Sequence, residues 1–152
     1  MKLWLLRHGE AESAARTDAE RNLTAYGRQQ VREAAAQLQG RPLQAVLVSP
    51  FVRAQQTADL LCEVLAFSGA RETVAWLTPE SDVRQAMRKL DGYPFKELLL
   101  VTHQPLVGAL AGLLIHGHRQ QPLAMNTASL ALLEGDALVA GLMALSVHQH
   151  PA

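Results

Sequence analysis

Strand-like and helix-like segments alternate along the whole chain, and this alternation limits the possible folds more than any other feature. Short apolar runs typical of buried strands occupy residues 2–7, 44–49, 73–78 and 97–102. Helical patterns occupy residues 25–40, 49–67, a segment that starts near Ser81, and 104–117. Strands joined by helical crossovers are normally parallel. The sequence therefore predicts an α/β fold with a mostly parallel central sheet and helices on both faces, in three layers.

Residues 1–152 are predicted to form one domain, because this length is usual for a single domain and no repeat or linker divides the chain. Two helix starts have clear signals, Thr24 as an N-cap and Ser49 as an N-cap followed by Pro50 at the first helical position. The final apolar segment, 128–145, resembles two strands around a Gly-Asp turn, and its apolar content also suits a buried helix.

Composition excludes several classes of partner. The chain has 14 basic and 14 acidic side chains, so no overall charge favours nucleic acid or an anionic membrane. No stretch approaches the roughly 18 apolar residues of a membrane span. Cys62 is the only cysteine, which allows no internal disulfide and fits a reducing cytoplasm. An anion bound by this protein must therefore meet local positive charge.

Polar residues follow three of the predicted strands at the points where these strands end. They are Arg7, His8 and Gly9 after the first, Ser49 and Arg53 after the second, and Thr102 and His103 after the fourth. Parallel strands place their carboxyl ends at one edge of a sheet, where ligands bind. Arginine forks and helix N-termini suit phosphoryl oxygens, and histidine adds a nucleophile. The sequence thus predicts a phosphoryl site at this edge.

Three segments with these residues resemble the signature blocks of a known family. They are "LLRHGE", "VSPFVRAQQTA" and "VTHQPLV", which in this order are similar to the histidine phosphatase superfamily with its phosphoglycerate-mutase-like fold. The short length, with "NLTAYG" (22–27) and "LTPESDV" (77–83), most resembles the small SixA-type branch of phosphohistidine phosphatases. The resemblance covers nearly the whole chain.

The resemblance implies a role for each matching residue. His8 would be the nucleophile that takes the phosphoryl group, and Arg7, Arg53 and His103 would bind its oxygens. Gly9 would let the backbone pass close to the ligand, and the N–H of Gln104 is a further expected donor. No metal or cofactor is expected, because the side chains supply the positive charge.

The implied substrate is a protein phosphohistidine, on a phosphotransfer domain of a bacterial signalling relay. A small phosphate ester, hydrolysed by a phosphomonoesterase of the same superfamily, is the alternative, and a phosphate-binding module without catalysis is a third possibility. Mutase-like members commonly have an Asn shortly after RHGE, where this chain has Ala14. This departure weakens the case for a sugar-phosphate or glycerate pocket.

The proton donor to the leaving group is left open by the sequence. Relatives that cleave esters usually have a carboxylic acid over the site, and Glu80 and Asp82 are the possible acids here. Acidic residues at a helix start are equally expected as solvated residues that favour the helix dipole. Two His-x-His pairs, at 116–118 and 148–150, have no nearby Cys or carboxylate, so no metal site is expected at either pair.

Overall fold

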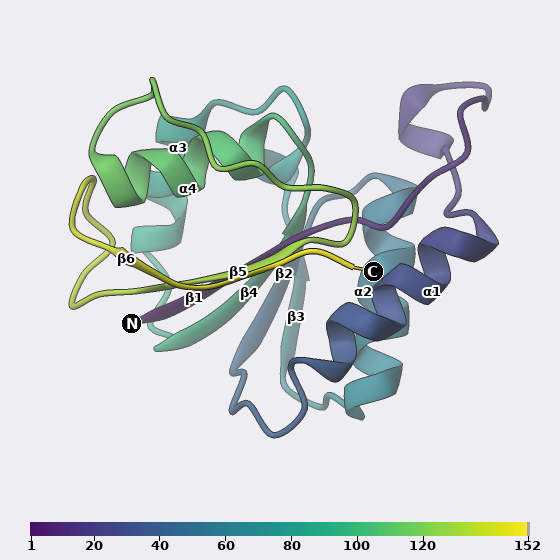
Figure 1. The fold of residues 1–152 in the computed structure, drawn as a ribbon, viewed down its shortest axis with the longest axis horizontal. Coiled ribbons are helices and arrows are strands. Elements are labelled where there is room, and N and C mark those ends of the chain that lie inside the picture. The colour runs from purple at the N-terminus through teal and green to yellow at the C-terminus, as the bar shows by residue number, and fades with distance from the viewer. Residues whose placement is uncertain (152) are drawn as a thin grey trace.

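A six-stranded sheet forms the centre of the computed structural model, which describes residues 1–151 (Figure 1). The strands are β1 (Lys2–Arg7), β2 (Ala45–Val48), β3 (Ala70–Thr73), β4 (Glu97–Thr102), β5 (Leu130–Glu134) and β6 (Ala144–Gln149). Their order in the sheet is β3-β2-β4-β1-β5-β6. The first four strands are parallel, β5 is antiparallel to β1, and β6 is antiparallel to β5. Only β5 is reversed, so the predicted mostly parallel sheet is confirmed.

Helices cover both faces of this sheet (Figure 1). They are α1 (Ala25–Ala36), α2 (Val52–Leu65), α3 (Val83–Asp91) and α4 (Leu106–His116), with short 3-10 turns η1 (Asp18–Glu20) and η2 (Ala75–Leu77). Side chains alternate along a strand, so Trp4 and Leu6 pack with α1 and α2, whereas Leu3 and Leu5 pack with α3 and α4. The molecule therefore has two apolar cores in one α/β domain, and the three-layer prediction is confirmed.

Two predicted strands lie at other residues than expected. The third strand was predicted at 73–78, but β3 ends at Thr73 and the apolar residues behind it form η2. Val74 and Leu77 are buried three residues apart, which is the spacing of a helical turn. β3 has an exposed, polar sequence with no apolar signal.

At the other edge of the sheet, the expected strand pair is present, but β6 begins only at Ala144. The segment between the two strands packs apolar side chains, Leu138 and Met143 among them, against the core under α3 and α4. The apolar pattern of residues 128–145 therefore comes partly from the loop between β5 and β6 and not from strands alone.

Helix ends also differ from the prediction. Thr24 caps α1 as expected, its side chain accepting a hydrogen bond from the N–H of Gly27, but α1 ends at Ala36 instead of residue 40. Ser49 is not the N-cap of α2, because the helix starts at Val52. The Ser49 hydroxyl has other partners, described below. Among residues 1–151, no helix has the length and apolar character needed to cross a membrane.

Candidate active site

His8 lies at the carboxyl end of β1, and its two ring nitrogens have different partners. Nδ1 is 2.7 Å from the carbonyl oxygen of Gly9, and Nε2 is 3.2 Å from Nε of Arg53. A carbonyl only accepts and a guanidinium only donates. Both contacts therefore require the same neutral tautomer, with the proton on Nδ1 and the lone pair on Nε2. Nε2 is therefore the ring nitrogen of His8 that could act as a nucleophile.

The positive surroundings of His8 favour this neutral form. Burial, and then the nearby guanidinium groups, lower the pKa of His8 from 6.5 to about 3, although the bond to Gly9 opposes the shift. Protonation of His8 would place another positive charge in a site that is already buried and cationic, so it requires a much lower pH than usual. His8 is therefore unprotonated on Nε2 at neutral pH, as a nucleophile must be.

Arg53 comes from the first turn of α2 and lies beside both histidines. Its side chain is buried, and its guanidinium carbon lies 5.1 Å from the centre of the Phe51 ring. Phe51 also makes an edge contact with His103, at 5.1 Å between ring centres. The aromatic ring thus orients a cation and an imidazole at the same edge of the sheet.

His103 lies at the exit of β4, with its ring centre 5.0 Å from that of His8. Its Nε2 is 2.7 Å from the Ser49 hydroxyl, which also accepts a hydrogen bond from the Phe51 N–H. Nδ1 of His103 is buried and has no hydrogen-bond partner among the described residues. Burial, followed by the charges of His8 and Arg53, lowers the pKa of His103 to about 2. When the Ser49 hydroxyl donates to Nε2, the neutral ring carries its proton on Nδ1, and a bound anion would favour this tautomer.

Arg7 is the last residue of β1 and contributes a second, partly buried cation. One terminal nitrogen donates to the carbonyl of Met125 at 2.9 Å, whereas the buried Nε has no partner among residues 1–151. Burial and the neighbouring Arg53 lower the pKa of Arg7 from 12.5. The unpartnered Nε of Arg7 and Nδ1 of His103 are the polar atoms that a bound phosphoryl group would satisfy.

The structure requires a glycine at position 9 because of close backbone packing, which the sequence did not indicate. A Cβ on Gly9 would lie 2.5 Å from the carbonyl oxygen of Gly27, and a Cβ on Gly27 would lie 2.0 Å from that of Glu10. The two glycines let the segment after β1 pass against the first turn of α1. The Gly9 N–H donates to the buried Thr57 hydroxyl at 3.2 Å. These contacts fix the backbone that holds the proton of His8.

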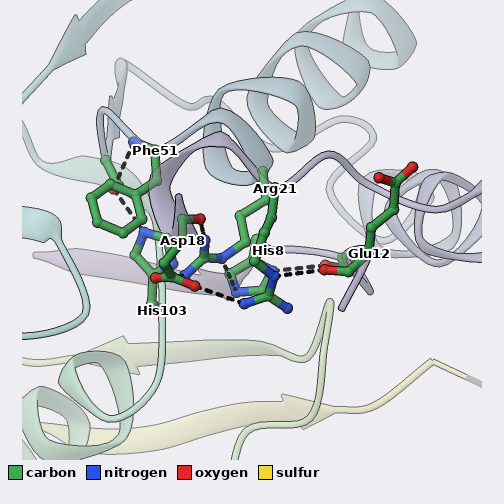
Figure 2. Close-up of polar contacts among 9 residues, drawn as sticks. His8, Glu12, Asp18, Arg21, Phe51 and His103 are labelled. Carbon is green, nitrogen blue, oxygen red and sulfur yellow. Dashed lines mark hydrogen bonds and ion pairs between the residues drawn. The ribbon is translucent and has the colours of Figure 1, made fainter. Parts of the chain in front are cut away.

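Asp18 and Arg21 belong to the site, although the sequence analysis did not select them. Figure 2 shows Asp18 near His8 and His103, with Arg21 beside it. The Asp18 carboxylate bonds to Arg53 at 3.1 Å and to Arg21 at 2.9 Å. Arg21 donates also to the Glu12 carbonyl, at 2.6 Å. These residues lie in the irregular β1–α1 loop, which has no strand or helix pattern that could have located them.

One further missed residue had a signal in the sequence, and one selected residue has another role than predicted. Thr57 is one helical turn after Arg53 and donates to its carbonyl at 2.8 Å, so helical periodicity placed both on one face. Ser49 was placed at the correct edge, but its role as partner of His103 replaces the predicted capping role.

The remaining predicted residues lie farther out. The N–H of Gln104 has no acceptor among the described residues, whereas its side chain bonds to Gly108 and Leu123. Glu80 is exposed and lines a small pocket that also includes Pro105. Asp82 caps α3, accepting from the Arg84 N–H at 3.0 Å, as expected for an acid at a helix start. The structure thus assigns Asp82 a structural role.

The site as a whole is a group of buried and partly buried cationic side chains around the imidazole of His8. Within residues 1–151, no group of three or more His, Cys, Asp or Glu side chains could hold a metal ion. The positive charge comes from Arg7 and Arg53, whose pKa values are lowered mainly by burial. An imidazole that faces bound phosphorus, with cations on the equatorial oxygens, is the arrangement of a histidine-based phosphatase.

Comparisons with known proteins agree with this class. A family model described as "Histidine phosphatase superfamily (branch 1)" matches residues 3–73. Phosphohistidine phosphatase SixA of Escherichia coli K12 is 33% identical over 136 residues, which cover 86% of this chain and 83% of that protein. A SixA homolog of Haemophilus influenzae is 31% identical, covering 90% and 89%. This chain belongs to the histidine phosphatase superfamily.

A solved structure extends the likeness to three dimensions. The protein histidine phosphatase SixA complexed with tungstate superimposes with a TM-score of 0.88 at 31% identity, over 99% of this chain and 97% of that one. The phosphoglycerate-mutase-like fold and the SixA-type branch predicted from the sequence are therefore confirmed.

Proposed function

We propose that this protein is a phosphohistidine phosphatase that removes the phosphoryl group from a histidine of a partner protein, through a phosphoenzyme on His8. The observation that carries the proposal is the fixed tautomer of His8. Gly9 holds the proton on Nδ1, which leaves the lone pair on Nε2, where it accepts a hydrogen bond from Nε of Arg53 until a phosphoryl group takes that place. The similarity to SixA over most of the chain supports the same activity.

In the first step, Nε2 of His8 attacks phosphorus while the bond from phosphorus to the substrate imidazole breaks. The substrate ring, protonated on its other nitrogen, takes the bonding electrons and leaves as a neutral imidazole. His8 becomes a phosphorylated imidazolium whose N–H remains on the Gly9 carbonyl. Arg7, Arg53 and Nδ1 of His103 stabilise the equatorial oxygens. The N–H of Gln104 is proposed as a further donor.

In the second step, water attacks phosphorus and the bond to His8 breaks. Both protons of the water remain on the released dihydrogen phosphate, and the imidazolium becomes neutral His8 again. Since the ring stays protonated on Nδ1 throughout, it is a good leaving group in this step. The Gly9 carbonyl therefore supports both formation and hydrolysis of the phosphoenzyme.

The short connection between α2 and β4 supports the proposal that the substrate is a protein. Between the end of α2 and the start of β4 there are only β3, η2 and α3, a short connection without a further domain to cover the site. A histidine on a protein surface needs such access. Protonation of the imidazole makes it a good leaving group, whereas an alkyl ester needs a general acid. Asp18 is ill suited to that role, because Arg21 above all lowers its pKa.

We further propose that the partner is a phosphotransfer domain and that the protein acts in the cytoplasm. The single cysteine is compatible with a reducing compartment. Nothing in this mechanism uses a metal or an organic cofactor.

The test compares one phosphohistidine protein with 3-phosphoglycerate and a sugar phosphate. We expect kcat/KM for the protein to exceed the values for the esters at least about a hundredfold, or roughly 2.7 kcal/mol in transition-state stabilisation. Efficient hydrolysis of the esters would favour the small-molecule phosphomonoesterase. Phosphate binding without turnover of any substrate would favour the module without catalysis.

A further inference from the structure

The carboxylate of Asp18 occupies N–H groups of the arginine that the proposed function assigns to the phosphoryl group. Arg53 has five N–H donors. One terminal nitrogen donates to the Asp18 carbonyl at 2.7 Å and the other to its carboxylate at 3.1 Å, while Nε donates to His8. Figure 2 shows the carboxylate of Asp18 directed into the group formed by His8, His103 and the arginines. A negative group of the chain itself therefore lies within the anion site.

This carboxylate is an anion in the folded protein. The hydrogen bond to Arg21, and further contacts with Arg53, lower the pKa of Asp18 from 3.8, while partial burial opposes the shift. Asp18 thus resembles a phosphoryl oxygen in both charge and hydrogen bonding. One N–H of Arg53 can donate to only one strong acceptor at a time. The Asp18 carboxylate and a phosphoryl oxygen therefore compete for the same N–H.

The segment that carries Asp18 can leave the site without disturbing the core. Asp18 begins η1, which buries none of its three residues. Its side chain is 59% exposed, whereas the Arg53 side chain is 5% exposed. The arginine is held by α2 and the core, so displacement of Asp18 would involve the loop and not Arg53. The Arg21 side chain, which is 28% exposed, also comes from this loop and can accompany Asp18.

We propose that Asp18 is a specificity residue, an internal anion that competes with substrate for Arg53 and lowers the affinity of the site for small phosphates. The inference rests on the proposed function. A small ester or inorganic phosphate must displace Asp18 with its phosphoryl contacts alone. A phosphohistidine protein also has surface contacts outside the site, and these offset the loss of the Asp18 contact. The carboxylate weakens every phosphoryl ligand by the same factor. Small phosphates, the free product among them, then bind too weakly to occupy the site, whereas a protein with additional surface contacts still binds.

The direct test is the binding of inorganic phosphate to Asp18→Asn, measured by calorimetry and by inhibition of turnover. Asparagine keeps the size of the side chain and the backbone bond to Arg53, and it removes the charge. If Asp18 occupies Arg53 in about nine molecules of ten, phosphate binds about tenfold more tightly once the competition is removed. The KM for p-nitrophenyl phosphate and the KM for a phosphohistidine protein should both fall by a similar factor, because both substrates must displace the same carboxylate.

Glu20→Gln is the matched control, because it removes one negative charge from the same loop. The Glu20 carboxylate contacts Arg16 and Thr17 and not the site. Its phosphate affinity should stay within about twofold of wild type, as expected for long-range charge effects in salt. Equal tightening in both variants would overturn the proposal, since overall charge would explain the result.

Weaker phosphate binding by Asp18→Asn would also overturn the proposal. If the carboxylate serves to position Arg53, the variant binds phosphate more weakly and loses kcat on both substrates. Unchanged affinity would show that Asp18 does not compete, and would leave the proposed function intact. Failure of phosphate to bind to wild type and to both variants, with thermal unfolding unchanged, would overturn the proposed function together with this inference.

Discussion

The two regions that form the site differ in burial and in what fixes them. His8, Arg53 and His103 follow buried strands or begin a helix, and each is at most 5% exposed. The β1–α1 loop contributes Asp18 and Arg21 through polar contacts alone, and its 3-10 turn buries no side chain. The core positions the groups to which the proposed chemistry is assigned, whereas the loop is held by polar contacts at the surface. Changes in the two regions should therefore have unequal effects.

The largest effects are expected from the two arginines, one at the end of β1 and one in the first turn of α2. Arg7→Ala and Arg53→Ala should each lower kcat/KM about a hundredfold, because a lost charge-assisted contact to the transition state costs about 3 kcal/mol. Steady-state kinetics with a phosphohistidine protein measure this. Arg88→Ala, at an exposed position of α3, is the control and should retain wild-type kinetics. A loss below about threefold in both Arg7→Ala and Arg53→Ala would contradict the assigned oxygen contacts.

A smaller effect is expected from the hydroxyl that orients His103. Ser49→Ala removes the 2.7 Å contact to Nε2, and loss of one neutral hydrogen bond is worth about 1 kcal/mol, or roughly fivefold in kcat/KM. Ser68→Ala, an exposed serine, provides the comparison. If the Ser49 variant behaved as the Ser68 variant does, His103 would not need this partner for its orientation.

The smallest effect is expected at the outer acid. Glu80→Gln should leave phosphohistidine turnover within about twofold of wild type, because an imidazole leaving group needs no donor over the site. Residual activity on alkyl esters should fall if Glu80 donates a proton there. Measuring both substrates on both proteins decides the role of this residue. Ester hydrolysis that is efficient in wild type and collapses in the variant would favour the small-molecule phosphatase.

The same division explains how much the sequence could predict. The strand exits were found because β1, β2 and β4 are continuous apolar runs, and parallel strands bring their carboxyl ends to one edge. Arg7, His8, Arg53 and His103 follow from this rule. Their partners do not, because the tautomer of His8 depends on a carbonyl whose direction is set by packing of Gly9 against α1.

The predictions from sequence are wrong or missing where the pattern of apolar and polar side chains does not reflect the backbone structure. β3 and β6 are edge strands with mostly exposed residues, so their sequences lack the apolar alternation of a strand. Asp18 reaches Arg53 across 35 positions of sequence from an irregular loop. No local pattern encodes such a contact, since it exists only after the sheet has brought β1 and α2 together.

The most direct test of the account is the position of the phosphoryl group on the enzyme during turnover. The protein is mixed with a labelled phosphohistidine protein, quenched in alkali, and its labelled peptide is analysed by mass spectrometry and NMR. We predict an acid-labile, alkali-stable adduct on Nε2 of His8, and no adduct or turnover in His8→Ala. Label on Nδ1 of His8 or on His103, or wild-type turnover by His8→Ala, would contradict the account.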